Sequence, residues 1–503
     1  MDNRGQWGTR AGFLLAAMGS AIGLGNIWRF PATAYENGGG AFFLPYLFAL
    51  LTAGIPILIM EFTIGHKLRG SAPNSFNKMD KKMEWIGWWQ VGISFVISTY
   101  YAVIIAWASM FAWYSIGLDW GSDTQTFFLN DFLNMTDPGV FGNIVPKVVL
   151  PLIVIWLIVL GVLSRGVKKG IEVANKIFIP TLVVLFLLIV IRAVTLEGAG
   201  AGLDAFFKPD WSSITDGSVW IAAYGQIFFS LSIAFAIMIT YSSYLPRKSD
   251  ITNNAFITGF ANSSFELLAG IGVFAALGFM AAQANVEVTE VVNGGIILAF
   301  VVFPEIISQM PFSAFFGVLF FLSLVLAGFS SLISISETYV SAVSEKFNIS
   351  RGASVVFGGG LAALISLAYA TQGGLALLDT VDHFINSYGV ALAGLVEVVA
   401  IAWLYRGLKD IQNHANSVSD IKIGAWWRYS ISIITPIVLG FMMVQNIRTE
   451  LASNYEGYPT DFLFTYGWLV VVGVIVVGVI LSIRKWPTQT TYETKQGGIT
   501  HDK

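Results

Sequence analysis

The sequence has no cysteine, only four histidines and few charged side chains. Of its 503 residues, 12% are charged and 55% are hydrophobic, and the mean hydropathy is +0.70. The lack of cysteine excludes disulfides, thiolate metal ligands and cysteine nucleophiles, and no other nucleophile motif indicates an enzyme. Soluble domains carry about 25% charged residues. The composition therefore predicts a protein that crosses the lipid bilayer many times and has no nucleic-acid partner.

Long apolar runs predict an all-α integral membrane protein with about twelve transmembrane helices, because roughly 20 apolar residues cross a bilayer. The runs cover residues 10–35, 40–66, 88–117, 147–164, 171–194, 217–244, 252–281, 313–345, 353–371, 378–405, 426–446 and 463–483. Lysine and arginine are concentrated in the termini and in alternate loops, which by the positive-inside rule predicts that both termini are cytoplasmic. We expect the loop at 282–312 to form short helices over an outer vestibule.

Residues 19–31, with the sequence GSAIGLGNIWRFP, lie in the middle of the first apolar run. Three glycines, an asparagine and Arg29 are poor material for a continuous lipid-facing helix, so we expect a break within 21–25. Unpaired backbone groups at membrane depth are tolerated only where protein, water or a ligand satisfies them. The break is therefore a candidate binding site.

A second break is expected at residues 226–240 in the sixth run, where Ser230 and Ser232 stand among apolar residues. Taken alone, these serines are more simply explained by hydrogen bonds to the preceding turn. Discontinuous first and sixth helices are, however, typical of an inverted repeat of five plus five helices with a site at the midplane. The predicted units are an N-terminal segment at 1–9, the two repeats at 10–195 and 217–405, helices 11 and 12 at 424–485, and a disordered cytoplasmic tail at 486–503.

Several motifs resemble the neurotransmitter:sodium symporter family, whose bacterial members include the leucine transporter. They are RGQWGTRAGFLLAAMGSAIGLGNIWRFP, ENGGGAFFLPY, EFTIG, QIFFSLS, SSYLP, AGFSS and DTVD, and they cover the first ten predicted crossings. The resemblance implies a symporter that uses sodium to import an amino acid or a derivative by alternating access. No aspartate stands beside Ala21, where monoamine carriers of the family hold the substrate amine, so a zwitterionic substrate is expected.

The resemblance places the substrate at the first break. Its carboxylate would face the amides of Leu24 and Gly25, at the positive end of a half-helix, and the hydroxyl of Tyr101, although a packing role for this tyrosine also fits the sequence. The other pocket residues implied are Ala21, Ile97, Phe229, Ser230, Ser232, Phe235, Ser331 and Ile335. This mostly apolar lining favours a neutral, hydrophobic amino acid.

Two sodium sites are also implied, and both use the oxygen ligands that this hard cation prefers. The implied ligands are Ala21, Asn26, Ser230 and Asn262 with the substrate carboxylate for the first ion, and Gly19, Ile22, Ala327, Ser330 and Ser331 for the second. Relatives often carry threonine or aspartate where Ser330 stands. Gly170 and Pro180 resemble the family spacing that lets the fifth helix unwind beside the second ion, while a simple kink is the alternative.

Glu266 follows Asn262 by one helical turn and is expected close to Tyr46 and Gln226. Chloride-dependent members of the family carry a neutral residue, commonly serine, at this position. A carboxylate here predicts that chloride is not required. We expect Glu266 to bind a proton on the return step of the empty carrier, with a permanently protonated or structurally paired glutamate as the alternative.

The resemblance further implies a gate on each side of the site. The gate residues are Arg29 and Asp382 above the ring of Phe235 on the outer side, and Arg4 and Glu345 beside Trp7 and Tyr244 on the inner side. Gates at both ends favour an occluded site over a channel.

We therefore expect a sodium-coupled, chloride-independent importer of a neutral, hydrophobic amino acid in the cell membrane, a monomer or weak dimer, with proton counter-transport as an option. The alternatives are an amino-acid sensor of the same fold that does not transport, and a carrier of another small organic solute.

Overall fold

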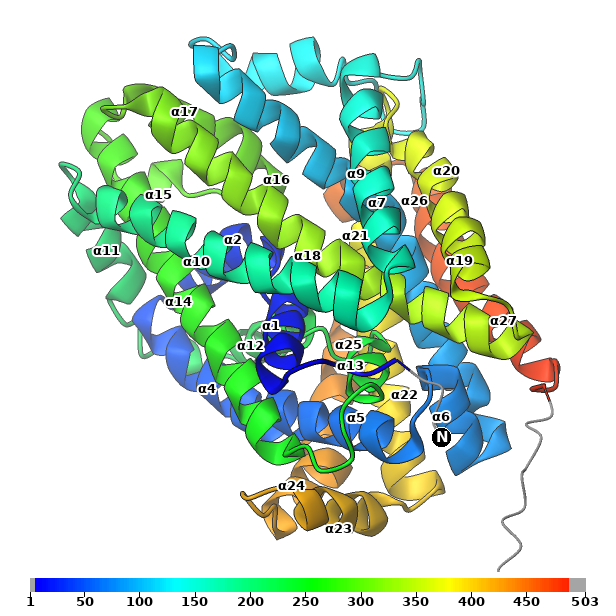
Figure 1. Cartoon of the computed structure of the whole chain (residues 1–503). Helices are drawn as coiled ribbons and strands as arrows, with labels where there is room; N and C mark the ends of the chain where they lie inside the picture. Colours follow the sequence, from blue (N-terminus) through cyan, green and yellow to red (C-terminus); the bar gives the residue numbers. More distant parts are fainter. Residues whose placement is uncertain (1–4, 488–503) are drawn as a thin grey trace, which may run out of the picture.

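The computed structural model describes residues 5–487 and is built from helices (Figure 1). Ten helical segments in this part are long and apolar enough to cross a membrane. The helices that form them are α4 (Phe43–Ala49) and α5 (Ile55–Leu68), α7 (Glu84–Gly117), α9 (Pro146–Ser164), α10 (Glu172–Val194), α14 (Ile251–Ala284), α18 (Ser313–Phe347), α19 (Arg351–Ser354) and α20 (Gly360–Tyr369), α21 (Gly374–Phe384) and α22 (Ala391–Val399), α24 (Ala425–Tyr429) and α25 (Thr435–Ala452), and α26 (Thr460–Leu463) and α27 (Leu469–Ile483). The predicted all-helical membrane fold is confirmed.

The first and sixth predicted crossings are each divided in two, as expected. The first consists of α1 (Arg10–Ala21), α2 (Leu24–Trp28) and α3 (Phe30–Glu36), and the chain bends there by 56°. The sixth consists of α12 (Gly217–Ser230) and α13 (Ile237–Ser242), separated by the non-helical residues 231–236. With these two broken segments, all the predicted crossings have a helical counterpart.

Shorter helices cover the two ends of the bundle. They are α6 (Ala72–Met79), α8 (Thr124–Thr126), α11 (Ala199–Phe207), α15 (Val288–Val291), α16 (Gly295–Ile297), α17 (Phe303–Gln309) and α23 (Leu408–Val418). The helices α15 to α17 are those expected within 282–312, and they lie at the opposite end of the bundle from α23 and α24 (Figure 1). We call the end with α15 to α17 the vestibule side and the end with α23 the closed side. Arg4 and most of the predicted tail lie outside the described residues.

The third crossing is longer than the sequence predicts, because a charged residue is buried at its start. The helix α7 begins at Glu84, whereas the apolar run begins at 88. The Glu84 carboxylate pairs with Lys346 and accepts hydrogen bonds from Asn77 (2.7 Å) and Trp88 (3.0 Å). Because partners inside the protein neutralise this charge, it does not mark the end of the crossing.

The first break lies at Ile22 and Gly23, between α1 and α2. Gly23 has an extended backbone with φ −120° and ψ −168°, and its N–H donates to the Asn26 side chain at 2.9 Å. The last carbonyls of a helix have no partner in the following turn. One of them, on Ser20, accepts a hydrogen bond from Ser232 in the second break at 2.8 Å. The second break therefore satisfies part of the backbone of the first.

The second break holds three residues in the left-handed region without a glycine. They are Ser232, Ala234 and Ala236, with φ of 53°, 63° and 63°. Each such residue costs about 1–2 kcal/mol, so its surroundings must fix it. Glu61 accepts a hydrogen bond from the N–H of Ala234 (2.7 Å), and Ser94 donates to the carbonyl of Phe235 (2.6 Å). Side chains of α5 and α7 thus replace the missing helical hydrogen bonds.

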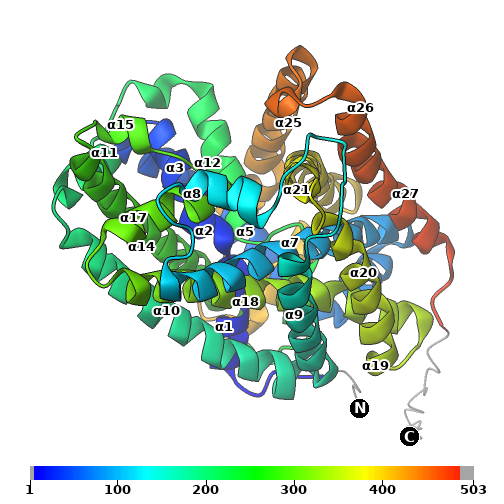
Figure 2. The ribbon, with the colours of Figure 1, turned by 90° about the horizontal axis from the view of Figure 1, so that it is seen from above.

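The helix α1 lies inside the bundle, packed against α10, α14 and α18 (Figures 1 and 2). The helices α25 to α27 lie at one edge, as Figure 2 shows in orange and red. Close packing around the centre depends on small residues. A Cβ on Gly328 of α18 would lie 2.5 Å from Ile105 of α7, and one on Gly65 of α5 would lie 2.0 Å from the carbonyl oxygen of Ile239. Both breaks are therefore enclosed by protein.

Two histidines join α23 to the bundle on the closed side. His66 Nδ1 and His414 Nε2 are 2.9 Å apart, and His66 Nε2 donates to the carbonyl of Pro246 at 2.9 Å. His66 therefore accepts at Nδ1, and His414 donates. Burial, together with His66 and Lys67 nearby, lowers the pKa of His414 from 6.5 to about 4.

The hydrogen-bonded pair of His66 and His414 is expected to make the folded state less stable in mild acid. The folded state resists protonation of His414 and the unfolded state does not, so the stabilisation is complete above pH 6.5 and is lost as the pH falls toward about 4. Thermal unfolding of the detergent-solubilised protein at about pH 7.5 and about pH 5 measures the effect. We expect a smaller fall in Tm for His414→Gln than for the unsubstituted protein. Equal falls would contradict this account.

Candidate substrate and ion sites

The two breaks line one central cavity. Its lining residues are Ser20, Ala21, Gly23, Leu24, Gly25, Asn26, Ile97, Tyr100, Tyr101, Phe229, Ser230, Ser232, Phe235, Ser331, Ile335, Asp382 and Asn386. Every residue that the sequence predicts for the substrate site is in this set. The structure therefore brings together residues from the first crossing, α7, the second break and α18. The sequence did not predict the other six lining residues for the substrate: Ser20, Gly23, Asn26, Tyr100, Asp382 and Asn386.

A vestibule of about 500 Å³ adjoins this cavity on the vestibule side. The cavity and the vestibule share Leu24, Gly25, Tyr101 and Phe229 as lining residues. The outer part of the vestibule is lined by Asp379, Tyr455 and Tyr458, and both tyrosine hydroxyls donate to the Asp379 carboxylate at 3.1 Å. The central site is therefore connected to the vestibule side in this conformation.

Two adjacent tyrosines of α7 take different positions. The N–H of Leu24 donates to the Tyr101 hydroxyl at 3.3 Å, so Tyr101 lies at the first break. The Tyr100 hydroxyl donates instead to Asp382 at 2.6 Å. The N–H groups at the start of α2 and the Tyr101 hydroxyl can together donate to a carboxylate. The position of Tyr101 agrees with the role that the sequence predicts for it.

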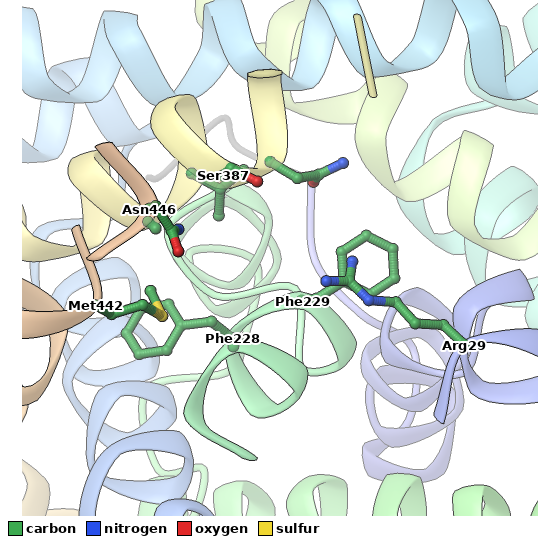
Figure 3. Close-up of a pocket in the computed structure, with 10 residues that line it drawn as sticks. Arg29, Phe228, Phe229, Ser387, Met442 and Asn446 are labelled. Carbon is green, nitrogen blue, oxygen red and sulfur yellow. The ribbon is translucent and has the colours of Figure 1, made fainter. Parts of the chain in front are cut away.

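Arg29 and Asp382 both face the vestibule, but no ion pair joins them in the part of the chain that the structure describes. The Arg29 guanidinium lies 4.6 Å from the centre of the Phe229 ring, and Figure 3 shows it over that ring, with Phe228 and Met442 on the other side of the view. Asp382 accepts from Asn386 at 2.9 Å. The two charges thus have separate partners in this conformation.

The aromatic ring beneath Arg29 differs from the sequence prediction. We expected Phe235 there, whereas the structure places Phe229 against Arg29. The reason is the second break. Phe229 is the next-to-last residue of α12, whereas Phe235 lies within the unwound residues 231–236 and lines the central cavity.

The residues predicted for the first sodium ion form a chain of amide hydrogen bonds. Asn26 donates to the side-chain oxygen of Asn262 at 2.8 Å, and Asn262 donates to Ser230 Oγ at 2.7 Å. All three side chains are buried. Ala21, the fourth predicted ligand, is the last residue of α1. Four oxygens thus gather between the first break, α12 and α14, and none carries a full charge.

The residues predicted for the second sodium ion lie where α1 meets α18. Ser331 Oγ is 3.4 Å from the carbonyl oxygen of Gly19, and a Cβ on Gly19 would lie 2.1 Å from Ser330 Oγ. Ala327 is one turn earlier on α18 and fully buried, and Ile22 is the first residue after α1. Glycine at position 19 leaves room for the two serine hydroxyls beside the backbone.

Glu266 lies where the sequence predicts, next to the first ion set. Its carboxylate accepts from the Tyr46 hydroxyl and from Gln226 Nε2 (2.6 Å), and the side chain is fully buried. Tyr46 also contacts Ser263 at 2.8 Å. Two donors aimed at one carboxyl group form a site for a negative charge.

The closed side is sealed by the start of the chain and by α13. Trp7 donates from its indole to the carbonyl of Tyr241 (2.8 Å) and from its backbone to that of Tyr244 (3.1 Å). Glu345 accepts from Ser71 Oγ and from Asn74, both at 2.9 Å. The predicted partner of Glu345, Arg4, lies outside the described residues.

Arg351 is a closed-side residue that the sequence did not single out. It donates two hydrogen bonds to the buried carboxylate of Glu337 (2.9 and 2.6 Å) and one to the carbonyl of Leu163 (2.7 Å). Tyr244 also donates to Glu337 at 2.7 Å. In the sequence Arg351 counted only as one of the basic residues between two crossings. Its partner could not be identified, because Glu337 lies within the preceding apolar helix.

The geometry suits binding and release of a small polar-headed solute with cations. The described residues contain no group of three or more histidine, cysteine or acidic side chains that could hold a metal ion. The residues predicted as ion ligands offer only backbone and neutral side-chain oxygens, which are the ligands that a monovalent hard cation accepts. The site is open toward one side and sealed toward the other.

Comparison with known proteins agrees with this description. The sequence profile of the sodium:neurotransmitter symporter family matches residues 4–130 and 118–489. An uncharacterized sodium-dependent transporter of Methanocaldococcus jannaschii is 42% identical over 485 residues, which cover 96% of this chain and 98% of that protein. The human sodium- and chloride-dependent neutral and basic amino acid transporter B(0+) is 29% identical, over 96% of this chain and 86% of its own.

A solved structure shares the fold. The crystal structure of MhsT in complex with L-phenylalanine superimposes with a TM-score of 0.75 at 32% identity, and the match covers 88% of this chain and 99% of MhsT. The fold and the site define a membrane transporter rather than an enzyme. The chain belongs to the sodium:neurotransmitter symporter family, and both the predicted family and the predicted fold are confirmed.

The close approach of Phe229 to Gly25 leaves no room for a side chain at position 25. A Cβ at this position would lie 2.2 Å from Phe229 Cε1, so alanine must displace the ring into the cavity or the vestibule. We expect Gly25→Ala to weaken sodium-dependent binding of a substrate by about tenfold or more, equivalent to about 1.4 kcal/mol. Gly440→Ala, where nothing lies within 4 Å of the new Cβ, should bind normally. Equal binding by both variants would contradict the prediction.

The ion pair between Glu337 and Arg351 is expected to help keep the closed side shut. The chain has no cysteine, so a cysteine introduced at position 334 in place of Ser334 is the only thiol that a reagent can label. Its labelling rate reports access from the closed side. Charge-assisted hydrogen bonds contribute about 1.5–3 kcal/mol each. We expect Glu337→Gln to speed labelling of this cysteine by about tenfold. Glu305→Gln on α17, at the other end of the bundle, serves as the control, and an unchanged rate in Glu337→Gln would show that the Arg351 contact does not hold the seal.

Proposed function

We propose that this protein imports a neutral, hydrophobic amino acid into the cell together with sodium. The observation that carries the proposal is the shared cavity at two broken helices. There the N–H groups of Leu24 and Gly25, at the start of α2, and the Tyr101 hydroxyl line the same space as Asn26 and Ser230. A substrate carboxylate in this space would contact the amides and complete the first sodium site, so binding of each would strengthen the other.

The substrate side chain would occupy the apolar half of the cavity. Ile97, Phe235 and Ile335 line that half, and the only acidic lining residue, Asp382, already accepts hydrogen bonds from Tyr100 and Asn386. A second positive charge on the substrate would therefore lack a free partner in the cavity. The similarity to MhsT, solved with L-phenylalanine, supports an uncharged and hydrophobic side chain.

Two sodium ions are proposed to drive the import. The proposed ligands are those that the sequence predicts. The hydrogen bonds that link Asn26, Asn262 and Ser230 support the first position, and the contact of Ser331 with the carbonyl of Gly19 supports the second. Each positive charge that moves inward gains about 2.3 kcal/mol per 100 mV of membrane potential. Transport would alternate between closing Arg29, Asp382 and Phe229 over the site and opening the closed side at Trp7, Tyr244 and Glu345.

Chloride is proposed to be unnecessary because Glu266 supplies a negative charge next to the first sodium ion. Tyr46 and Gln226 donate hydrogen bonds to its carboxylate. Asn262, which bonds to Ser230 and is a proposed ligand of the first sodium ion, lies one helical turn before Glu266. When sodium leaves, a buried carboxylate without a nearby cation favours a proton. Proton counter-transport through Glu266 then follows as part of the proposal.

The proposed location is the cell membrane, with both termini in the cytoplasm, as the distribution of basic residues predicts. The closed side would then be cytoplasmic and the vestibule side extracellular. We propose a monomer or weak dimer, because each chain holds a complete set of site residues. A sensor that binds without transport is the second candidate. The sealed closed side with its own network of partners favours a carrier.

Uptake into proteoliposomes tests the proposal. Uptake of a panel of radiolabelled neutral amino acids is measured with purified, reconstituted protein under three conditions. The first has an inward sodium gradient, the second has potassium in place of sodium, and the third has gluconate in place of chloride. We expect accumulation that requires sodium and survives loss of chloride. Binding of panel members without accumulation would favour the sensor. The absence of both binding and accumulation would contradict the proposal that the substrate is an amino acid of this panel.

Glu266→Ser tests the chloride argument separately. We expect uptake by this variant to require chloride, because the neutral serine leaves the first sodium ion without its negative neighbour. Glu305→Gln, on the vestibule side and away from the cavity, should remain chloride-independent. If Glu266→Ser still transports without chloride, the carboxylate does not replace the anion.

A further inference from the structure

Asn175 is a buried polar residue that neither the substrate site nor the predicted sodium ligands include. It lies on α10 between Gly170 and Pro180, and none of its surface is exposed. Its side-chain N–H group donates to the carbonyl of Ile171, one turn earlier, at 2.9 Å. This bond fixes the amide so that Oδ1 points away from its own helix. A polar side chain inside a membrane helix is a candidate for function.

The amide oxygen of Asn175 points at the second sodium site. It lies 2.5 Å from Ser330 Oγ of α18. A Cβ added to Gly19 of α1 would lie 2.1 Å from Ser330 Oγ and 2.6 Å from Asn175 Oδ1. Three helices therefore meet at this point, and the backbone of Gly19 fits between the two oxygens because it has no side chain.

We propose that Asn175 is a positioning residue of the second sodium site and that it acts through Ser330. An amide oxygen can only accept, so the proton of this hydrogen bond belongs to the Ser330 hydroxyl. With its proton directed at α10, the serine oxygen keeps its lone pairs for the ion. The inference rests on the proposed sodium-coupled transport and adds α10 to the elements that determine sodium affinity.

Serine at position 330 makes such a partner necessary. A β-branched threonine is restricted in its side-chain rotation, whereas a serine hydroxyl has three staggered positions of similar energy. The hydrogen bond to Asn175 supplies the missing restraint from a neighbouring helix.

The start of α10 is also bound to the chain before α1. Glu172 accepts from the N–H of Gly8 at 2.6 Å and from the hydroxyl of Thr9 at 2.8 Å. Glu172 and Asn175 are three residues apart and thus lie on adjacent positions of one helical face. Movement of α10 relative to α1 and α18 would therefore turn the Ser330 hydroxyl away from the ion and lower sodium affinity.

The test is sodium binding to the purified full-length protein without substrate, because the first sodium site would share the substrate carboxylate. Radiolabelled sodium in a scintillation proximity assay gives the half-saturating concentration. We expect Asn175→Ala to raise this concentration about tenfold, equivalent to about 1.4 kcal/mol. Ser323→Ala is the matched control, since Ser323 is a buried serine of α18 bonded only to Leu319 of its own helix, and it should leave sodium binding unchanged.

Rescue separates positioning from packing. We expect Ser330→Thr in the Asn175→Ala background to restore the half-saturating concentration to within about threefold of the unsubstituted value, because threonine restrains its own hydroxyl. Asn175→Asp keeps an acceptor oxygen and is expected to bind sodium at least as tightly as the unsubstituted protein, which provides a second variant if Asn175→Ala folds poorly.

Three results would overturn the inference: normal sodium affinity in Asn175→Ala, no rescue by Ser330→Thr, or an Asn175→Asp variant as weak as Asn175→Ala. An unsubstituted protein that binds no sodium would instead contradict the proposed function itself. The two failures are therefore distinguishable.

Discussion

The structure depends on one constraint, which is that backbone groups in a bilayer must find partners within the protein. A continuous helix satisfies this automatically, and a broken helix does not. Here two helices break at the same depth and beside each other, so that Ser232 of one break binds the carbonyl of Ser20 in the other. The groups that remain face a cavity. The proposed substrate and ion sites are consistent with this arrangement, because a solute with a carboxylate and a small cation would supply the missing partners.

The surrounding helices hold the breaks in place with polar side chains that are themselves buried. Glu61 and Ser94 bind the unwound residues 234 and 235, and Asn175 holds Ser330 toward the end of α1. Each of these contacts joins two crossings that are distant in the sequence. Such contacts between crossings are the elements through which the proposed alternating access would couple binding to helix packing.

Much of the organisation could be predicted from the sequence. Long apolar runs located the crossings to within a few residues, because the bilayer requires a fixed length of apolar helix. The glycines and Asn26 located the first break, since they weaken helix formation locally. The family motifs then identified the residues of the central cavity, and the structure brings all of the predicted substrate residues together. The division into repeats and the roles of the individual residues remain proposals.

The sequence by itself determined the membrane class, the positions of the long apolar helices and the family, because these depend on composition and local pattern. Tertiary structure alone decided which distant side chains meet. It placed Phe229 rather than Phe235 against Arg29, since unwinding at 231–236 moves the later ring to the deeper cavity. It also extended α7 through a charged residue, paired Glu337 with Arg351 and aimed Asn175 at Ser330. A buried polar residue carries no record of its partner in the local sequence, because that partner arrives only when the helices pack.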